Sequence, residues 1–552
     1  MGCEAKRIDA IIISQNVFTG TNDEAKPAAI ALSGDRIAAV GNACDLRDLA
    51  ANANTGQTPA RVFDFEDAFV TPGFHDSHLH FFHSALYSSP LAEMFLGENE
   101  ADCVRRMQEL SLRRPTGWLL SQGWREYRWN PPVMPSKHSL DAAFPDRPVA
   151  LYSGDAHTLW LNSVALRELG VNNDSVAPAG GSYDRDDTGE LTGIVREAAA
   201  MELMPKIVGA FTDAEIDDAY RGFLARLARE GITGVCDMSL MASPGLDFIR
   251  DDSFARLLEK DELTARIHMF PTLLADQSRF ERMLRDYTHP LLSTRGFKQF
   301  FDGVSSQHTA WVTDPYTNAR FADDCGRPTI DPALMRDYVL AAAEKGYPVR
   351  IHTIGDAAIH AALNFFEEAR ERFGELPQGR RNCLEHVENF LPDDIARLAS
   401  LNVVAAVQPP HITLDPGGPE RDLGNERVPY MWPLRALLDV GGTLAFGTDS
   451  PVVDVKSMDM LYVAVTRQDP ATHEPAGGWL PSERVSMAEA IRAYTLGSAT
   501  AASRAHELGT IAPGMLADIT VVDRNLLISD AADIQKTRTL ATFTGGRCVY
   551  TA

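Results

Sequence analysis

The sequence predicts an α/β protein whose main domain is a (β/α)8 TIM barrel, joined to a small β-sandwich domain built from both chain termini. Three observations predict this fold: short strand-like runs near both ends, strand-like runs that alternate with helical patterns between them, and polar residues at the ends of those runs. Eight parallel strands linked by helices close naturally into a barrel, whose active site lies at the carboxyl ends of the strands.

Both ends of the chain are rich in short strand-like runs separated by turn residues. These runs are 10–13, 28–32, 36–40 and 61–65 near the N-terminus, and 517–523 and 539–546 near the C-terminus. Neither end carries enough apolar surface for a domain of its own, so we expect the two ends to pair. We therefore assign residues 1–70 and 500–552 to the sandwich domain and residues 71–490 to the barrel.

The middle of the chain alternates strand-like runs with helical periodicity, which is clear in 332–345, 357–372 and 487–496. Such alternation is typical of a parallel sheet. One strand ends at His78, and seven more runs follow at 234–238, 266–270, 296–301, 348–352, 381–386, 402–407 and 443–449.

The connection after the first barrel strand, roughly residues 82–211, is far longer than a normal loop. It contains four of the seven tryptophans of the chain, Trp118, Trp124, Trp129 and Trp160. An apolar substrate wall or lid over the barrel mouth would explain them, and the core of a separate subdomain explains them equally well. We name Trp124 as a candidate substrate contact.

The chain is acidic, with 52 Lys and Arg against 76 Asp and Glu and a formal charge of -24. Phosphates would be repelled, so we expect a small-molecule substrate and no nucleic-acid or membrane partner. The seven cysteines form no CxxC pair and indicate neither a disulfide framework nor a thiolate zinc site. The first residues lack a signal-like apolar run, and we expect a cytoplasmic protein that forms a homodimer or larger homo-oligomer.

The most informative motif is His78-Leu79-His80 at the end of an apolar strand. Residues i and i+2 of a strand point to the same face, so both imidazoles can bind one metal ion. Neighbouring His75 faces the other way, and His83 lies past the strand end. Further candidate ligands stand in or just after later strand-like runs: Lys298, His352, His386 and Asp449.

Imidazole and carboxylate ligands suit zinc, manganese or iron, and we choose zinc first, as one or two ions. A bound metal lowers the pKa of water to about 7, and Asp449 could accept the proton. Each candidate alone has an ordinary explanation as a packed histidine or a turn aspartate. Their shared position at strand ends, in barrel order, favours the metal site.

These motifs resemble the amidohydrolase superfamily and, within it, amidohydrolase family 3. The resemblance covers essentially the whole chain, through the segments 71–80, 153–158, 162–166, 231–235, 298–303, 352–356, 385–386, 408–409, 447–452 and 509–518. It implies that His78 and His80 bind the more buried metal and that His352 and His386 bind a second one. It also implies that a carboxylated Lys298 bridges both ions and that Asp449 passes a proton to the leaving nitrogen. An ion pair between Lys298 and Asp302 is the alternative for the lysine.

The resemblance further implies that His157, together with Asn162, polarises the scissile carbonyl, with structural packing as the alternative. Other residues are candidates for lining the pocket or orienting ligands. The candidates for lining the pocket are Tyr316, Gln408 and His411, and the candidates for orienting ligands are Asp302 and Asp356.

Together these features predict a metal-dependent hydrolase that uses activated water on the C–N bond of an amide-type substrate. An N-acyl amine, an N-formyl amine or a cyclic amide would fit. A metal-dependent deaminase of a ring amine is the alternative, and a non-catalytic scaffold of the same fold is a remote one.

Overall fold

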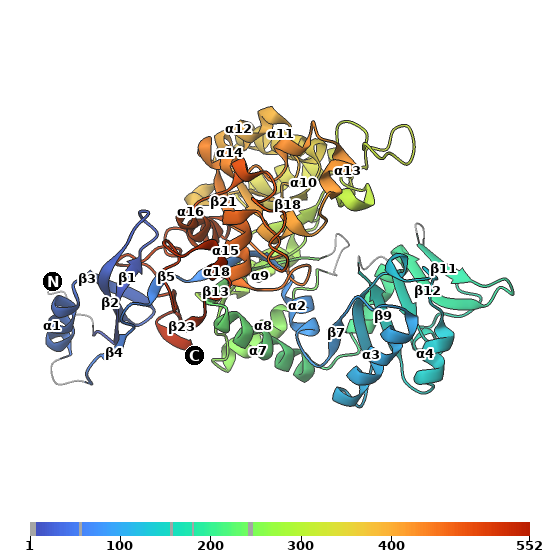
Figure 1. The fold of residues 1–552 in the computed structure, drawn as a ribbon, viewed down its shortest axis with the longest axis horizontal. Helices are drawn as coiled ribbons and strands as arrows, with labels where there is room; N and C mark the ends of the chain where they lie inside the picture. The colour runs from blue at the N-terminus through green and yellow to red at the C-terminus, as the bar shows by residue number, and fades with distance from the viewer. Residues whose placement is uncertain (1–6, 55–57, 155–157, 179–180, 241–246) are drawn as a thin grey trace. The chain divides into compact units, whose positions relative to one another are not determined.

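The computed structural model describes residues 7–54, 58–154, 158–178, 181–240 and 247–552 (Figure 1). The chain divides into two compact units, and both are mixed α/β. The first comprises Met1–Phe81, Leu224–Ile249 and Glu262–Ala552, and the second Phe82–Phe223 and Arg250–Asp261. Within the described ranges, no helix has both the length and the apolar character needed to cross a membrane.

The first unit contains eight parallel strands, one in each of the eight predicted runs. They are β6 (Phe74–Leu79), β13 (Ile232–Met238), β14 (Arg266–Phe270), β17 (Phe297–Phe300), β18 (Val349–Thr353), β19 (Cys383–His386), β20 (Val404–Val407) and β21 (Thr443–Phe446). One sheet has the order β15-β16-β14-β13-β6, where β15 (Thr288–His289) and β16 (Leu292–Thr294) are short additions, and the other has the order β17-β18-β19-β20-β21. Parallel bridges from Leu79 to Ser450 and from Thr272 to Lys298 link the two sheets.

Helices follow the strands of the first unit along the chain, as the periodicity predicts. They include α9 (Ser278–Asp286), α10 (Pro332–Glu344), α11 (Asp356–Phe373), α12 (Pro392–Ser400), α13 (Gly418–Leu423), α14 (Leu434–Asp439), α15 (Ser457–Thr466), α16 (Met487–Arg492), α17 (Ser498–Ala501) and α18 (Ala531–Ile534). Helix α10 starts where the sequence marks it, because Asp331 accepts hydrogen bonds from the backbone N–H groups of Ala333 and Leu334, and Pro332 follows it. The central strands are buried on both faces, as parallel strands covered by helices are.

Strands from both chain ends form one eight-stranded sheet with the order β24-β23-β22-β5-β1-β2-β3, and β4 pairs with β1. Its members are β1 (Ala10–Phe18), β2 (Ala25–Ser33), β3 (Arg36–Gly41), β4 (Arg61–Asp64), β5 (Phe69–Pro72), β22 (Ile519–Val522), β23 (Thr539–Thr544) and β24 (Arg547–Thr551). Ile12, Val70 and Phe543 share one core. The alternate residues Ile11 and Ile13 pack on the other face with Leu46 of α1 (Ala43–Ala53).

This terminal sheet belongs to the same compact unit as the parallel strands. Arg266 of β14 and Asp518, next to β22, form a buried ion pair with an Nε–Oδ2 distance of 2.7 Å. The Thr520 hydroxyl donates to the Gly231 carbonyl, just before β13. The sheet is therefore tied to the parallel strands by buried polar contacts.

The second unit has a sheet of its own with the order β11-β12-β10-β9-β8-β7. Its strands are β7 (Ala92–Met94), β8 (Leu119–Trp124), β9 (Val149–Ser153), β10 (Thr158–Leu161), β11 (Gly181–Arg185) and β12 (Leu191–Glu197). The helices of this region include α2 (Phe81–Tyr87), α3 (Glu100–Arg113), α4 (Lys137–Ala143), α5 (Ser163–Glu168), α6 (Ala198–Val208), α7 (Asp213–Arg229) and α8 (Asp251–Glu259). Trp124 lies against Trp129 and Trp160, with ring centroids 5.9 and 6.2 Å away. These three tryptophans form a packed core, which is the second of the two explanations offered by the sequence.

Candidate metal centre

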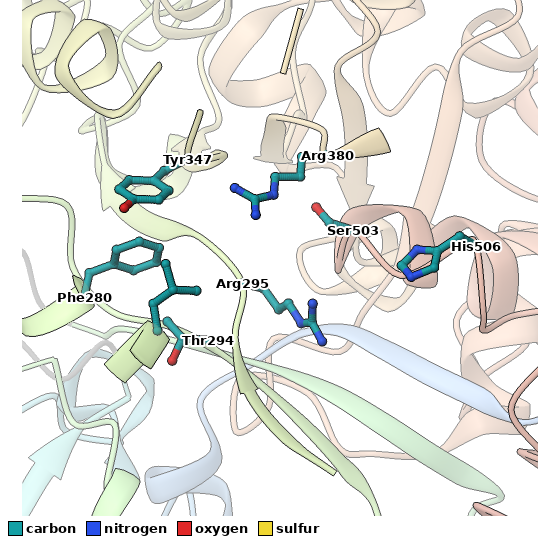
Figure 2. A pocket seen from close by; sticks show the side chains of 8 residues that line it. Phe280, Thr294, Arg295, Tyr347, Arg380, Ser503 and His506 are labelled. Carbon is teal, nitrogen blue, oxygen red and sulfur yellow. The ribbon is translucent and has the colours of Figure 1, made fainter. Parts of the chain in front are cut away.

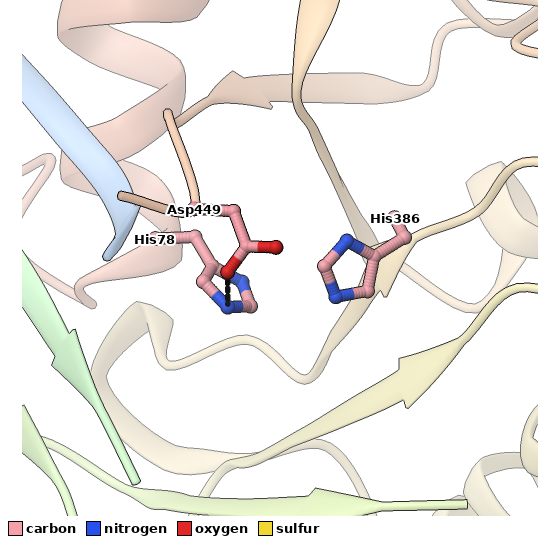
Figure 3. A group of neighbouring side chains, drawn as sticks. All are labelled: His78, His386 and Asp449. Atoms are coloured by element: carbon pink, nitrogen blue, oxygen red, sulfur yellow. Dashed lines mark ion pairs between the residues drawn. The ribbon is translucent and has the colours of Figure 1, made fainter. Parts of the chain in front are cut away.

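Three buried side chains from distant parts of the chain meet in the first unit. Ligand atoms of His78, His386 and Asp449 all lie within 4.8 Å of one another. Figure 3 shows the Asp449 carboxylate next to the His78 ring, with the His386 ring facing the same space; the Asp449 Oδ1 to His78 Nε2 distance is 3.4 Å. His78 lies in β6, His386 ends β19 and Asp449 follows β21. A site at the carboxyl ends of parallel strands requires these positions.

The backbone turns sharply where two of these ligands lie. His386, Val387 and Asp449 have φ angles of 71°, 42° and 56°, which non-glycine residues rarely adopt. Such strained conformations persist where the surrounding structure imposes them, and they gather at functional sites. The Asp449 N–H donates to the His78 carbonyl at 2.6 Å, which ties the turn after β21 to β6.

Gly447 allows this close approach. A Cβ atom at this position would lie 2.5 Å from the His78 backbone nitrogen, closer than any real contact. A glycine is therefore required at this point because the backbones of β6 and the segment after β21 meet there.

Each of the four candidate ligand histidines donates one ring N–H to an oxygen acceptor. The Nδ1–H groups of His78, His80 and His386 donate to Glu385 Oε2, the Met238 carbonyl and Gln408 Oε1 at 2.6, 3.0 and 2.9 Å, and the Nε2–H of His352 donates to the Gly303 carbonyl at 3.1 Å. The second nitrogen of each ring then carries a lone pair. Metal-binding histidines are oriented in this way in proteins.

The histidine rings also lie close to one another. The His352 ring centroid is 4.4 Å from that of His386, and His80 Nε2 is 3.1 Å from Asp449 Oδ1. Burial, followed by the charge of Lys298, lowers the pKa of His78 to about 4 and that of His352 to about 3. Both rings are therefore neutral at pH 7, which is the form that binds metals.

A buried network of charged side chains orients the His78 ring. Glu385, which accepts from His78, also accepts from Arg350 Nε at 2.6 Å, and Arg350 Nη2 donates to the Ser77 carbonyl at 2.8 Å. Burial alone would raise the pKa of Glu385, but Arg350 and His78 outweigh it and hold this pKa below its usual range. The carboxylate is therefore ionised and fixes the orientation of the His78 ring.

Lys298 in β17 is fully buried beside these groups. Its Nζ lies 4.8 Å from the centroid of the Phe300 ring and has no hydrogen-bond partner among the described residues. Burial lowers its pKa to about 8, although Glu385 and Asp449 act in the opposite direction. No ion pair with Asp302 occurs in the part of the chain that the structure describes. The alternative explanation for this lysine is therefore not supported.

A family profile described as "Amidohydrolase family" matches residues 61–550. The chain belongs to this family. It is 28% identical to Protein LONG AFTER FAR-RED 3 of Arabidopsis thaliana over 98% of this chain and 91% of that protein. It is 26% identical to N-substituted formamide deformylase of Arthrobacter pascens over 98% of both chains. The solved structure of an uncharacterized metal-dependent hydrolase from Pyrococcus horikoshii has a TM-score of 0.76 at 22% identity, with 95% of this chain and 99% of that chain covered.

Asp302 and Asp356 of this amidohydrolase hold the backbone around His352. Asp302 accepts hydrogen bonds from the N–H groups of Ile354, Gly355 and Trp311, at 2.8 to 3.0 Å for its shortest contacts. Burial raises its pKa to about 7, despite these backbone donors. Asp356 begins α11 and accepts from Thr313 N at 2.7 Å. Both side chains position loops next to the candidate ligands.

Two of the predicted pocket residues lie at the centre. His411 Nε2 is 3.9 Å from Asp449 Oδ2, and its ring is parallel to that of His386 with centroids 6.1 Å apart. Gln408 contacts His386 and has a buried Nε2 without a described partner. The Tyr316 hydroxyl donates a hydrogen bond to the Ala310 carbonyl, and the ring stacks on that of His308. These are the contacts of a packed residue.

The candidates from the second unit have local structural contacts. Trp124 Nε1 donates to the Leu151 carbonyl, and its side chain is fully buried in the core of that unit. Asn162 caps α5, accepts from Val149 N and donates to the Phe144 and Arg147 carbonyls. These contacts give both residues a packing role, which differs from the predicted substrate contact. His157 lies outside the described residues.

Sequence reasoning missed the roles of Glu385 and Arg350. One signal was available, since Arg350 is a charged residue inside an apolar strand and stands two residues before His352, on the same face. A buried arginine requires an acid partner, and Glu385 on the next strand provides it. His75 does face away from the centre, as predicted, and lies against His268 and Cys236.

Proposed function

We propose that this amidohydrolase cleaves the C–N bond of an amide-type small molecule, an N-formyl or N-acyl amine or a cyclic amide, with metal-activated water. The observation that carries the proposal is that the His78, His80 and His386 imidazoles lie next to the Asp449 carboxylate, with His352 against His386, and that each of the four rings is oriented by a hydrogen bond. The likeness to a formamide deformylase along nearly the whole chain supports the choice of an amide bond.

The residues fit a divalent cation, with zinc as our first choice. The donors are nitrogen and carboxylate oxygen, His78 and His352 are neutral at pH 7, and His78 Nε2 is buried without a described hydrogen-bond partner. His78, His80, His386 and Asp449 would hold one ion, and His352 with Lys298, after its carboxylation, would complete a site for a second. When bound, the cation supplies Lewis acidity toward the carbonyl group and lowers the pKa of water.

Asp449 would transfer the proton from the attacking water to the departing nitrogen. Burial acts to raise its pKa, but the surrounding histidines outweigh burial and keep the pKa well below the usual range, so the carboxylate is ionised. It can accept the proton of the attacking water and return it to the departing nitrogen. His411, close to Asp449 Oδ2, is placed to donate a hydrogen bond to the carbonyl oxygen as charge develops there.

We further propose that the eight parallel strands close into a barrel. The bridge between Leu79 and Ser450 links β6 to the segment after β21, and the bridge between Thr272 and Lys298 links the segment after β14 to β17. Closure would bring ligands from β6, β17, β18 and β19, and from the segment after β21, to one mouth. The terminal sheet would then form the small β-domain expected from the sequence.

The proposal is tested with Asp449→Asn and a panel of formamides, N-acyl amino acids and hydantoins. We expect turnover of at least one amide class by the wild-type protein, and a fall in kcat of about 10²–10⁴-fold in the variant with the bound metal retained. Release of acid and amine is the readout, and elemental analysis identifies the metal. Ammonia from aminopurines without acid from any amide would instead establish the deaminase. Unchanged turnover in the variant would remove Asp449 from the mechanism.

A further inference from the structure

A cavity of about 390 Å³ lies in the first unit, and none of the candidate metal ligands lines it. Figure 2 shows its lining, which consists of Phe280, Leu284, Thr294, Arg295, Tyr347, Arg380, Ser503 and His506. Three of these side chains come from residues just before β17, β18 and β19, whereas the candidate ligands lie at the other ends of the strands. The cavity is therefore at the amino ends of the strands, and its volume is in the range of small-molecule sites.

Two arginines in the lining lack acidic partners. Arg295 Nε donates to the Ser293 hydroxyl at 2.8 Å, and Arg380 Nη1 donates to the Gly346 carbonyl at 2.8 Å. Neither forms an ion pair with a carboxylate among the described residues. Most of each guanidinium therefore remains available to an acceptor from outside the chain.

The charges around Arg295 do not neutralise it. Arg504 and Arg380 are both positive, and Glu507 is the nearby acid. Glu507 already pairs with Arg504 at 2.6 Å and Arg36 at 3.1 Å, and His506 is a further 3.7 Å contact. Burial, and next the charge of Arg504, lowers the pKa of Arg295 to about 10, so it still carries its charge at pH 7. The cavity therefore holds an excess of positive charge.

Two residues of the lining, Thr294 and Ser503, carry hydroxyl groups. Thr294 Oγ1 and Ser503 Oγ are buried and have no hydrogen-bond partner among the described residues, and Thr294 is only 3% exposed. Both residues border the cavity, but their hydroxyl oxygens do not open onto it.

The opposite wall is aromatic. The Phe280 and Tyr347 rings lie 4.8 Å apart and are inclined at 61°. In Figure 2 this pair stands on one side, Ser503 and His506 stand on the other, and the two arginines lie between them. The arrangement presents an apolar surface next to cationic donors.

We propose that this cavity binds a small organic anion that carries an oxyanion group on an aromatic ring. Arg295 and Arg380 hold the oxyanion, since guanidinium groups match the geometry of carboxylate and phosphate oxygens. The ring packs on Phe280 and Tyr347. The site is independent of the proposed hydrolytic reaction and requires no metal.

The test is isothermal titration calorimetry of the full-length protein with benzoate, phenyl phosphate and inorganic phosphate. We expect saturable binding of benzoate or phenyl phosphate, at least tenfold tighter than that of inorganic phosphate. Arg295→Gln and Arg380→Gln should each weaken it at least tenfold, as the loss of a charge-assisted hydrogen bond does. Benzoate and phenyl phosphate distinguish a carboxylate ligand from a phosphate ligand.

The matched control is Arg285→Gln, which removes the same charge from α9, the helix of Phe280, at a side chain that is 72% exposed and outside the lining. It should bind like the wild type. Absence of saturable binding, or binding that is unchanged in both cavity variants because the anion sits elsewhere, would overturn the proposal. Inorganic phosphate binding as tightly as the aromatic anions would also overturn it. If one of the two arginine variants fails to fold, the other variant still tests the proposal.

Discussion

At the scale of single residues, the candidate centre depends on partners that the sequence does not place next to one another. The motif residues His78, His80, His386 and Asp449 were predictable because strand-end histidines and carboxylates have a recognisable chemistry. Their hydrogen-bond partners were not, since His78 and Glu385 are 307 residues apart and only the folded chain brings them together. For Trp124 the sequence left two explanations open, because composition cannot separate an aromatic wall from an aromatic core, and the structure gives it the contacts of a core residue.

Glu385→Gln tests the buried charges behind His78. The substitution leaves Arg350 buried without its acid partner, so we expect a loss of about 3–5 kcal/mol in the free energy of unfolding. Metal affinity should fall by about 10–100-fold because His78 loses its orienting carboxylate. Urea unfolding and metal titration measure the two effects. Adding Arg350→Met should restore stability without restoring metal affinity; recovery of both would contradict the orienting role.

The pH dependence of stability tests the state of His352. Its pKa falls from 6.5 in the unfolded chain to about 3 in the folded one, so the unfolded state binds more protons between these values. Its contribution is complete above pH 6.5 and is lost as the pH falls toward 3, by up to about 1.4 kcal/mol per pH unit. Unfolding of metal-free protein at several pH values should show a shallower loss for His352→Gln than for wild type. Parallel curves would mean that the pKa of the ring is the same in the folded and unfolded states.

At the scale of elements, the sequence predicted each of the eight parallel strands, because short runs that begin or continue with buried apolar residues alternate with helical periodicity. The six-stranded sheet of the second unit was not predicted, although its strands are about as long as the parallel strands of the first unit. The sharp turns after β19 and β21 were not predicted either. Their positions with positive φ are occupied by residues other than glycine, which is the residue that usually marks such turns in a sequence.

Gly447→Ala tests the contact between β6 and the segment after β21. The added methyl group would collide with the His78 backbone, so we expect a loss of about 1–3 kcal/mol in stability and reduced metal binding. Gly222→Ala is the control, because a Cβ atom at this helical position meets nothing within 4 Å. It should keep or raise stability, by up to about 1 kcal/mol. Equal effects of the two substitutions would show that the contact is not tight.

At the scale of the whole molecule, the two chain ends were expected to pair, and the structure adds what joins them. The pairing of β5 with β22 brings both ends of the chain into one sheet, and this sheet shares a compact unit with the parallel strands. The buried pair of Arg266 and Asp518 could not be foreseen, since each residue alone resembles an ordinary surface charge.

Asp518→Asn tests how strongly the terminal sheet is tied to β14. Because Arg266 is 1% exposed, the loss of its partner should cost about 3–5 kcal/mol in the free energy of unfolding. Asp23→Asn is the control, since Asp23 also joins a terminal segment to the remainder through Arg492 but is 75% exposed. It should cost less than about 1 kcal/mol. Chemical denaturation compares the two, and equal costs would argue against a tightly coupled sheet.

The left-handed backbone at His386, Val387 and Asp449 has a consequence for protein design. Grafting the four histidines and the aspartate onto the straight strand ends of an unrelated scaffold would misdirect two of the side chains. A successful transplant would have to carry the chain reversals themselves, together with the bare backbone at Gly447 that lets them fit.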